Sequence, residues 1–423
     1  MFRSALLSSA VLALAFLAAP GAAHAQEVAA AVRTGDAAAL AALSETASSQ
    51  EARLARAALA ALHHQDAAAI PDLRAAARSR RLSAETRLSA YQALGSIYLR
   101  QGRFADAAAA LADGAALGVT QEPERAHTYA QAQAFAAALA HEAPMRARVP
   151  AGGDLPLTRD MAQLLRADVT INGAAHSQAI LDTGAAYSTI MRSVAEQLGL
   201  RFVDSDVTVG SSSHENVPAQ LAIADTLTLG GAEFHNVVFI VFPDEALTFA
   251  GGAYRIEAIV GLPVLIQLGR LEFALGASGD HLHYTRAGGA PGPAPNLLVD
   301  GLQPVAVVQS GDATLRMLLD TGAQNSQLSR IVERDYPALL EGAEERAATI
   351  GGAGGVRTDA QALSIPRLTL NVAGRDVALS NVRLMRAGRA MDRHGILGQD
   401  VLRSGGGYVL DFQTMRFELL ERG

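Results

Sequence analysis

The octapeptide L-D-T-G-A-A-Y-S occupies residues 181–188, and L-D-T-G-A-Q-N-S occupies residues 319–326. Their aspartates, Asp182 and Asp320, are 138 residues apart (320 minus 182). A single Asp-Thr-Gly arises by chance at roughly one in several thousand positions of average composition. Two copies within the same longer pattern are far less expected by chance.

Further landmarks accompany both aspartates in the same order. A turn precedes each one, and glycines after an expected strand, an Asn-Val pair, an apolar-apolar-Gly triplet and an aromatic strand follow. The matching stretches are Asn172-Gly173 and Ser310-Gly311, Val209-Gly210-Ser211 and Ile350-Gly351-Gly352, Asn236-Val237 and Asn381-Val382, Ile259-Val260-Gly261 and Ile396-Leu397-Gly398, and Leu271-Glu272-Phe273 and Leu410-Asp411-Phe412. This conserved order indicates an internal duplication.

Short apolar stripes after each motif predict a helix in each half. The stripes are Ile190, Val194 and Leu198, and Leu328, Val332 and Tyr336. Ser188 and Ser326 lie six residues after the aspartates and are expected to cap these helices, because a serine hydroxyl readily accepts a bond from a free N–H of the first turn.

The first 25 residues predict a cleavable signal peptide. Arg3 precedes an apolar run that is too short for a comfortable membrane span, and Ala23-His24-Ala25 forms a cleavage site after a Pro-Gly break. We therefore expect a periplasmic or secreted protein without a membrane span in the mature chain. The chain has no cysteine, so neither a disulfide nor a lipid-modified cysteine can form. A net charge of −7 gives no reason to expect a nucleic acid partner.

Composition divides the mature chain into a helical part and a β-rich part. Residues 26–150 are rich in alanine and poor in β-branched residues, which favours helices. Within them, YQALGSIYLRQGRFADAAAAL at 91–111 resembles one tetratricopeptide (TPR) repeat, with small residues where two antiparallel helices would approach. This predicts a small all-α, TPR-like helical-hairpin domain. It is either a docking surface for a protein partner or a spacer and cap for the next domain.

The β-rich part has two halves of similar length. Stretches such as ADVTINGAAHSQAIL at 167–181 alternate and contain an Asn-Gly turn, which is typical of a β-hairpin. Gly, Pro and Ala dominate RAGGAPGPAPN, which predicts an extended linker. The expected units are 151–286, a linker at 287–296, and 297–423.

The duplicated D-T-G turns and apolar-apolar-Gly triplets resemble the retropepsin-like aspartic proteases in a single-chain, two-lobed bacterial form, over roughly residues 155 to 423. The resemblance implies a mainly β fold of two β-barrel lobes in tandem. It places the catalytic pair on Asp182 and Asp320. The supporting loops would contain Thr183, Gly184, Ala185, Thr321, Gly322, Ala323, Gly261 and Gly398.

The chemistry of peptide hydrolysis explains why one chain would carry two such turns. Two carboxyl groups about 3 Å apart cannot both ionise readily, so they share a proton and supply acid and base together. Both lobes form in one chain, so we expect a monomer with an intramolecular pseudo-dimer that needs no metal or cofactor. Alanine follows each D-T-G, where pepsin-like lobes offer a hydroxyl to the carboxylate. Losing that donor should raise the carboxyl pKa, so we expect a mildly acidic optimum.

Each lobe also has a candidate flap, a β-hairpin that covers a bound peptide. The expected tips begin at Gly210 and Ser211 in the first lobe and at Gly351 and Gly352 in the second. Glycine-rich tips can move and let backbone approach a peptide that adds as an extra strand. The alternative for these segments is a pair of ordinary surface hairpins.

The expected function is an aspartic endopeptidase acting on peptide or protein substrates. Two aspartates also occur in glycosidases, but the paired turns give no reason for the separation of at least about 5 Å that those enzymes need. His281 and His283 alternate on an expected strand beside Asp280, without further ligands nearby in sequence, so we expect surface histidines and no metal site. The remaining alternative is a noncatalytic peptide-binding or scaffolding protein built on the protease fold.

Overall fold

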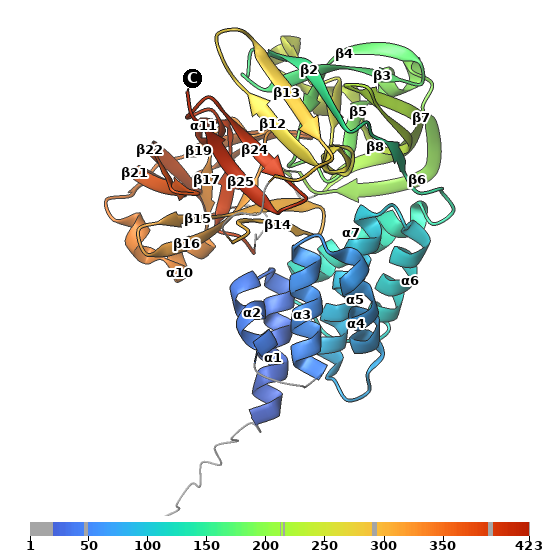
Figure 1. The fold of residues 1–423 in the computed structure, drawn as a ribbon, viewed down its shortest axis with the longest axis vertical. Helices are drawn as coiled ribbons and strands as arrows, with labels where there is room; N and C mark the ends of the chain where they lie inside the picture. The colour runs from blue at the N-terminus through green and yellow to red at the C-terminus, as the bar shows by residue number, and fades with distance from the viewer. Residues whose placement is uncertain are drawn as a thin grey trace, which may run out of the picture.

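The computed structural model describes residues 20–45, 50–211, 213–214, 216–289, 294–387 and 392–422. Residues 1–19 of the predicted signal peptide and residues 290–293 of the predicted linker lie outside the described residues. Helices form the N-terminal part of the chain and strands dominate after residue 145, so the predicted mainly β fold with N-terminal helices is confirmed. Figure 1 shows the helices packed beneath the two β-rich lobes.

The N-terminal part is a succession of helices, each packed against the next, with an alanine-rich core. Ser83 begins the longest of them because its hydroxyl accepts from the Thr86 N–H at 3.1 Å. A Cβ on Gly95 would lie 2.7 Å from the Leu111 side chain, so the small residue permits the close approach of two helices. The helices are α1 (Pro20–Thr34), α2 (Ala37–Glu45), α3 (Gln50–Leu62), α4 (Asp66–Arg78), α5 (Ala84–Arg100), α6 (Phe104–Ala115) and α7 (Pro123–Ala138).

The first lobe is a closed barrel in the strand order β3-β4-β11-β5-β8-β7, with β7 returning to β3. The Asn172-Gly173 turn joins β3 to β4, and both residues have positive φ as a two-residue hairpin requires. The elements are β1 (Arg146–Arg148), β2 (Gly152–Arg159), β3 (Leu165–Ile171), β4 (Ala174–Leu181), β5 (Ser188–Met191), α8 (Arg192–Gln197), β6 (Arg201–Val209), β7 (Val217–Leu229), β8 (Ala232–Phe242), β9 (Thr248–Phe249), β10 (Tyr254–Arg255), β11 (Ala258–Val260), α9 (Leu262–Leu265), β12 (Arg270–Ala274) and β13 (Asp280–Thr285).

The second lobe has the corresponding strand order β15-β16-β23-β17-β22-β21, closed by β21 on β15. A separate hairpin, β19 with β20, extends from it. The elements are β14 (Leu297–Asp300), β15 (Gln303–Ser310), β16 (Ala313–Leu319), β17 (Gln327–Ser329), α10 (Ile331–Asp335), β18 (Glu344–Glu345), β19 (Ala348–Gly352), β20 (Gly355–Asp359), β21 (Leu363–Val372), β22 (Arg375–Met385), β23 (Gly395–Leu397), α11 (Gln399–Leu402), β24 (Gly407–Asp411) and β25 (Arg416–Leu420). Short 3-10 helices lie at Asp244–Leu247, Ala250–Gly252, Ile266–Leu268 and Pro337–Leu340.

The two aromatic strands that the sequence aligned pair with each other. β12 of the first lobe runs antiparallel to β24 of the second, in the order β25-β24-β12-β13-β2. Phe273 lies opposite Tyr408, and their rings stack with centroids 4.5 Å apart, both fully buried. This shared sheet joins the two lobes, so the halves cannot separate without exposing buried apolar side chains.

The helical domain contacts both lobes: Glu142 forms an ion pair with Arg201 of the first lobe at 2.6 Å, and two further contacts reach the second lobe. The Arg100 side chain forms a buried ion pair with Asp66 and donates to the Gly301 carbonyl at 3.2 Å. Arg316 of the second lobe donates to the Thr34 carbonyl at 2.6 Å, at the C-terminal end of α1. None of the helices that the structure describes is both long and apolar enough to cross a membrane.

Candidate active site

Each aspartate follows directly on a buried strand that pairs with the triplet strand. Leu181 lies beside Val260 in the parallel pair β4–β11, and the Asp182 N–H donates to the Val260 carbonyl at 3.0 Å. The second lobe repeats this arrangement, because Leu319 lies beside Leu397 and the Asp320 N–H donates to the Leu397 carbonyl at 3.1 Å. The β5 and β17 strands pair on the other side of the triplets. Both aspartates therefore emerge from strand ends that are fixed on two sides.

The two threonines of the motifs bind each other's loops. The Thr183 N–H donates to the Thr321 hydroxyl at 2.9 Å, and the Thr321 N–H donates to the Thr183 hydroxyl at 3.2 Å. Each hydroxyl in turn donates to the carbonyl that precedes the opposite aspartate, Leu319 or Leu181, at 2.7 Å. Both threonines are completely buried. This reciprocal set of bonds fixes the separation and orientation of the two turns.

The glycines place the two carboxyl groups together. The Gly184 N–H donates to Asp182 at 2.8 Å, and the Gly322 N–H donates to Asp320 at 2.9 Å. A Cβ on Gly184 would lie 2.4 Å from the Asp320 carboxyl carbon, and one on Gly322 would lie 2.5 Å from that of Asp182. Each carboxyl group therefore lies directly against the opposite turn, in space that only glycine leaves open.

Burial raises the pKa of both aspartates above the ordinary value, although backbone N–H donors partly oppose this. The pKa of Asp320 is raised well above it, because the neighbouring Asp182 charge adds to the effect of burial. Two carboxyl groups in such contact titrate as a pair, so the site retains one proton at a pH where isolated aspartates are ionised. The pair can therefore present an acid and a base at once.

The glycines of the triplets support the turns from behind. A Cβ on Gly261 would lie 2.6 Å from the Tyr187 backbone, and one on Gly398 would lie 2.8 Å from the Ala323 carbonyl oxygen. The carbonyls of Ala185 and Ala323 accept from the next residue after each glycine, at 2.9 and 2.8 Å. All the supporting residues named from the sequence thus lie around the two aspartates.

The expectation that Ser188 and Ser326 cap helices is wrong. Ser188 lies in β5, and its hydroxyl accepts from the Gly261 N–H at 3.2 Å, whereas Ser326 accepts from the Gly398 N–H at 3.0 Å. Both hydroxyls bind the turn of the triplet because a strand intervenes before α8 and α10 begin. For the same reason, Ile190 and Leu328 of the expected stripes lie in strands.

Two residues near the site were missed in the sequence. Gln399 is fully buried, and its side-chain amide donates to the Thr321 carbonyl at 2.8 Å. Tyr187 is also buried, and its hydroxyl donates to the Leu99 carbonyl of the helical domain at 3.1 Å. The polar residue directly after Gly398 could have indicated that Gln399 supports the second turn. The contact of Tyr187 with a distant domain, in contrast, leaves no pattern in the neighbouring residues.

The candidate flaps of the two lobes meet each other. The Ser211 hydroxyl, one residue after Gly210, donates to the Ala353 carbonyl of the second-lobe hairpin at 2.7 Å. Arg357 donates to the Ser213 carbonyl at 3.0 Å. Gly351 and Gly352 lie in β19, and the turn that follows them makes the contact. The two hairpins therefore form a connected pair.

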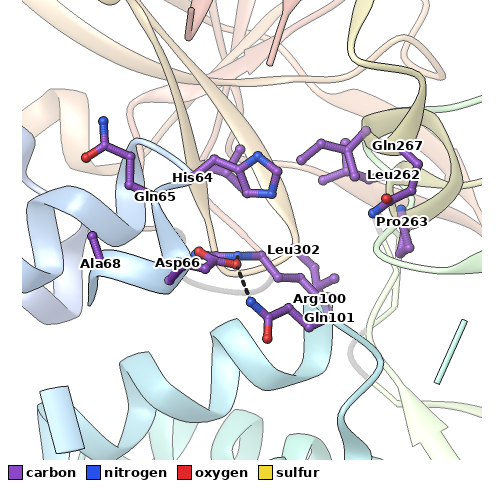
Figure 2. Close-up of a pocket in the computed structure, with 13 residues that line it drawn as sticks. His64, Gln65, Asp66, Ala68, Arg100, Gln101, Leu262, Pro263, Gln267 and Leu302 are labelled. Atoms are coloured by element: carbon purple, nitrogen blue, oxygen red, sulfur yellow. Dashed lines mark hydrogen bonds and ion pairs between the residues drawn. The ribbon is translucent and has the colours of Figure 1, made fainter. Parts of the chain in front are cut away.

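Two other features of the structure lie apart from the aspartate pair. His281 and His283 each contact Asp154, at 3.1 and 2.7 Å, but among the described residues no cluster of His, Cys, Asp or Glu could hold a metal ion. A cavity of about 570 Å³ lies between the helical domain and both lobes. Figure 2 shows residues that line it, including His64, Arg100 and Leu262. Neither Asp182 nor Asp320 lines it.

Comparison with known proteins places the family likeness on the first lobe. Residues 167–264, which contain Asp182 and Gly261, match the aspartyl protease family model. The chain also matches the crystal structure of a retropepsin-like aspartic protease from Rickettsia conorii, with 15% identity and a TM-score of 0.22, over 33% of this chain and 94% of that one. A search of curated proteins finds no match. The aspartyl protease match over residues 167–264 confirms, for the first lobe, the aspartic protease resemblance predicted from the duplicated motif.

Proposed function

We propose that the chain is an aspartic endopeptidase whose dyad, Asp182 and Asp320, activates water for the hydrolysis of peptide bonds. The family match on residues 167–264 supports a peptidase. The observation that carries the dyad is the contact of each carboxyl group with the opposite glycine turn, held by the reciprocal threonine bonds. Acid–base catalysis needs two carboxyl groups this close together. Without such a role, the arrangement would only place two like charges in unfavourable contact.

The proposed reaction uses both protonation states of the pair. The ionised carboxyl group removes a proton from water as the water oxygen attacks the peptide carbonyl carbon, and the protonated group donates to the carbonyl oxygen. The resulting gem-diol then collapses: the C–N bond breaks, the leaving amine takes a proton from the pair, and one gem-diol hydroxyl returns a proton to the pair as the carbonyl re-forms. Products are a carboxylic acid and an amine, and the dyad returns with one shared proton.

The raised carboxyl pKa values support activity under mildly acidic conditions. A pair that already holds one proton above pH 4 does not require strong acid to reach the active form. We propose that cleavage is fastest between about pH 4 and pH 6. A rate maximum near pH 2 would contradict this reasoning.

We also propose that the enzyme acts in the periplasm or outside the cell, as a monomer. Localisation rests on the predicted signal peptide, and a fusion of residues 1–25 to a reporter enzyme, followed by cell fractionation, tests it. The helical domain remains a candidate site for a protein partner.

The decisive experiment is cleavage of a diverse peptide library from about pH 3 to pH 7 by the wild type and by Asp182→Asn and Asp320→Asn. We expect either substitution to abolish cleavage. Asp168→Asn is the matched control, because Asp168 is an exposed carboxylate on the same lobe. Activity that survives one dyad substitution would disprove a shared site. Absence of cleavage by the wild type would favour the noncatalytic peptide-binding alternative.

A further inference from the structure

The helix α7 packs against the first catalytic turn. Tyr187 lies five residues after Asp182, and its ring centroid is 4.5 Å from that of Phe135 on α7. Phe104 of α6 also contacts this ring at 6.5 Å, and only 7% of Tyr187 is exposed. The helical domain thus covers the segment that leads away from the first aspartate.

The same helix contacts the first-lobe flap. The ring of His127 lies 2.6 Å from the Asn216 amide oxygen, and the Gln131 amide lies 3.5 Å from the Thr208 hydroxyl. Thr208 and Asn216 belong to the two arms of the loop that reaches the second flap. Figure 1 shows α7 at the edge of the helical domain that faces β6.

The N-terminal end of α7 reaches the second lobe. Arg125 forms an ion pair with Asp392 at 2.7 Å, and Glu124 forms one with Arg330 at 3.4 Å. Asp392 precedes β23, which carries the second triplet, and Arg330 follows β17, which pairs with it. One helix therefore contacts the first catalytic turn, the flap above that lobe, and the opposite lobe.

The equivalent position in the second lobe carries exposed polar side chains in place of a ring buried by the helical domain. Asn325 lies five residues after Asp320, as Tyr187 does after Asp182, and both Asn325 and Gln324 are exposed. Gln324 donates to the carbonyl of Ala162, next to Met161, which is 70% exposed. Val356 on the second flap is 60% exposed. These are the large apolar side chains most exposed among the described residues, and Met161 lies next to the residue that Gln324 contacts.

We propose that α7 closes one end of the peptide-binding path, so that the chain admits only a few substrate residues at the first-lobe end and an extended peptide at the second-lobe end. This inference rests on the proposed function. A peptide bound across both turns runs from Tyr187 toward Asn325. At the first-lobe end the peptide meets helix α7. At the second-lobe end it meets exposed surface with apolar side chains, which can bind apolar substrate residues. The prediction is a limit on substrate length on one side of the scissile bond alone.

A peptide ladder tests this with the full-length mature protein. One cleavable core sequence is extended on either side by up to about eight residues, each adding roughly 3.4 Å of extended chain. We expect kcat/KM to fall by at least about tenfold as one side is extended and to reach a plateau as the other is extended. The double variant His127→Ala/Gln131→Ala removes contacts of α7 with the flap and should raise the ratio of long-peptide to short-peptide kcat/KM by at least about threefold.

The matched control is Arg53→Ala, which removes an exposed ion pair with Asp72 inside the helical domain and should leave this ratio unchanged. Cleavage with no length limit, or with equal limits on both sides, would overturn the inference while leaving the protease function in place. A one-sided limit that the double variant does not alter would show that α7 is not the barrier. If no peptide is cleaved, the proposed function fails. In that case, fluorescence anisotropy measures Kd for the same peptides, each carrying a label. A Kd that rises when the peptide is extended on one side only would support the inference, and a Kd with no such one-sided dependence would overturn it.

Discussion

Replacing Thr183 with valine should loosen the two catalytic turns while keeping the size and branching of the side chain. The substitution removes the hydroxyl that accepts from the Thr321 N–H and donates to the Leu319 carbonyl, and both partners are buried. Each orphaned group costs about 1–3 kcal/mol, so the loss of two should lower the free energy of unfolding by about 2–6 kcal/mol. Small displacements of reacting groups are costly, so kcat should also fall by on the order of 10- to 100-fold.

Urea titration of Thr183→Val and peptide cleavage by the same sample measure the two effects. Thr189→Val is the matched control, because Thr189 is also buried but its hydroxyl makes only one long bond, 3.5 Å, to the Tyr187 carbonyl. The control should cost less than about 1 kcal/mol. Thr321→Val should behave like Thr183→Val. Equal stability of Thr183→Val and the control would refute the argument that the reciprocal bonds hold the turns together.

Three further predictions concern other positions. Gly184→Ala should abolish cleavage, because the new Cβ would lie 2.4 Å from the second carboxyl carbon, whereas Gly276→Ala, with open space around its Cβ position, should cleave normally in the same fluorogenic assay. Asp320→Asn should melt at a higher temperature than the wild type at pH 7. The raised pKa means that the folded chain holds a proton that the unfolded chain releases above about pH 4, so wild-type stability falls as pH rises through this window. The advantage should shrink below pH 4, and calorimetry that shows no gain at pH 7 would contradict it. Arg100→Ala should lower the free energy of unfolding by about 3–5 kcal/mol in a urea titration, because it leaves a buried carboxylate unpaired, and a loss below about 1 kcal/mol would contradict this.

Local sequence was sufficient to find the turns and their direct supports. An Asp-Thr-Gly turn needs a strand before it, a glycine within it and a second strand beside it, and all three leave residue patterns at fixed distances. The places of Asp182, Gly184 and Gly261 were therefore predictable. The same local reasoning failed for Ser188, because a serine before an apolar stripe reads as a helix cap unless the strand between them is recognised.

By itself, the sequence determined that two equivalent aspartate turns exist, because duplication and turn chemistry are properties of residue order. The tertiary structure decided which groups meet. Only folding brings β12 against β24, and Tyr187 beneath α7, because these contacts join segments far apart in the chain through shape and burial. It also made the two ends unequal: Tyr187 is buried and Asn325 is exposed, although their turns match. The physical reason is that a domain outside the repeat covers Tyr187 but leaves Asn325 exposed, and no local pattern encodes which surface such a domain will cover.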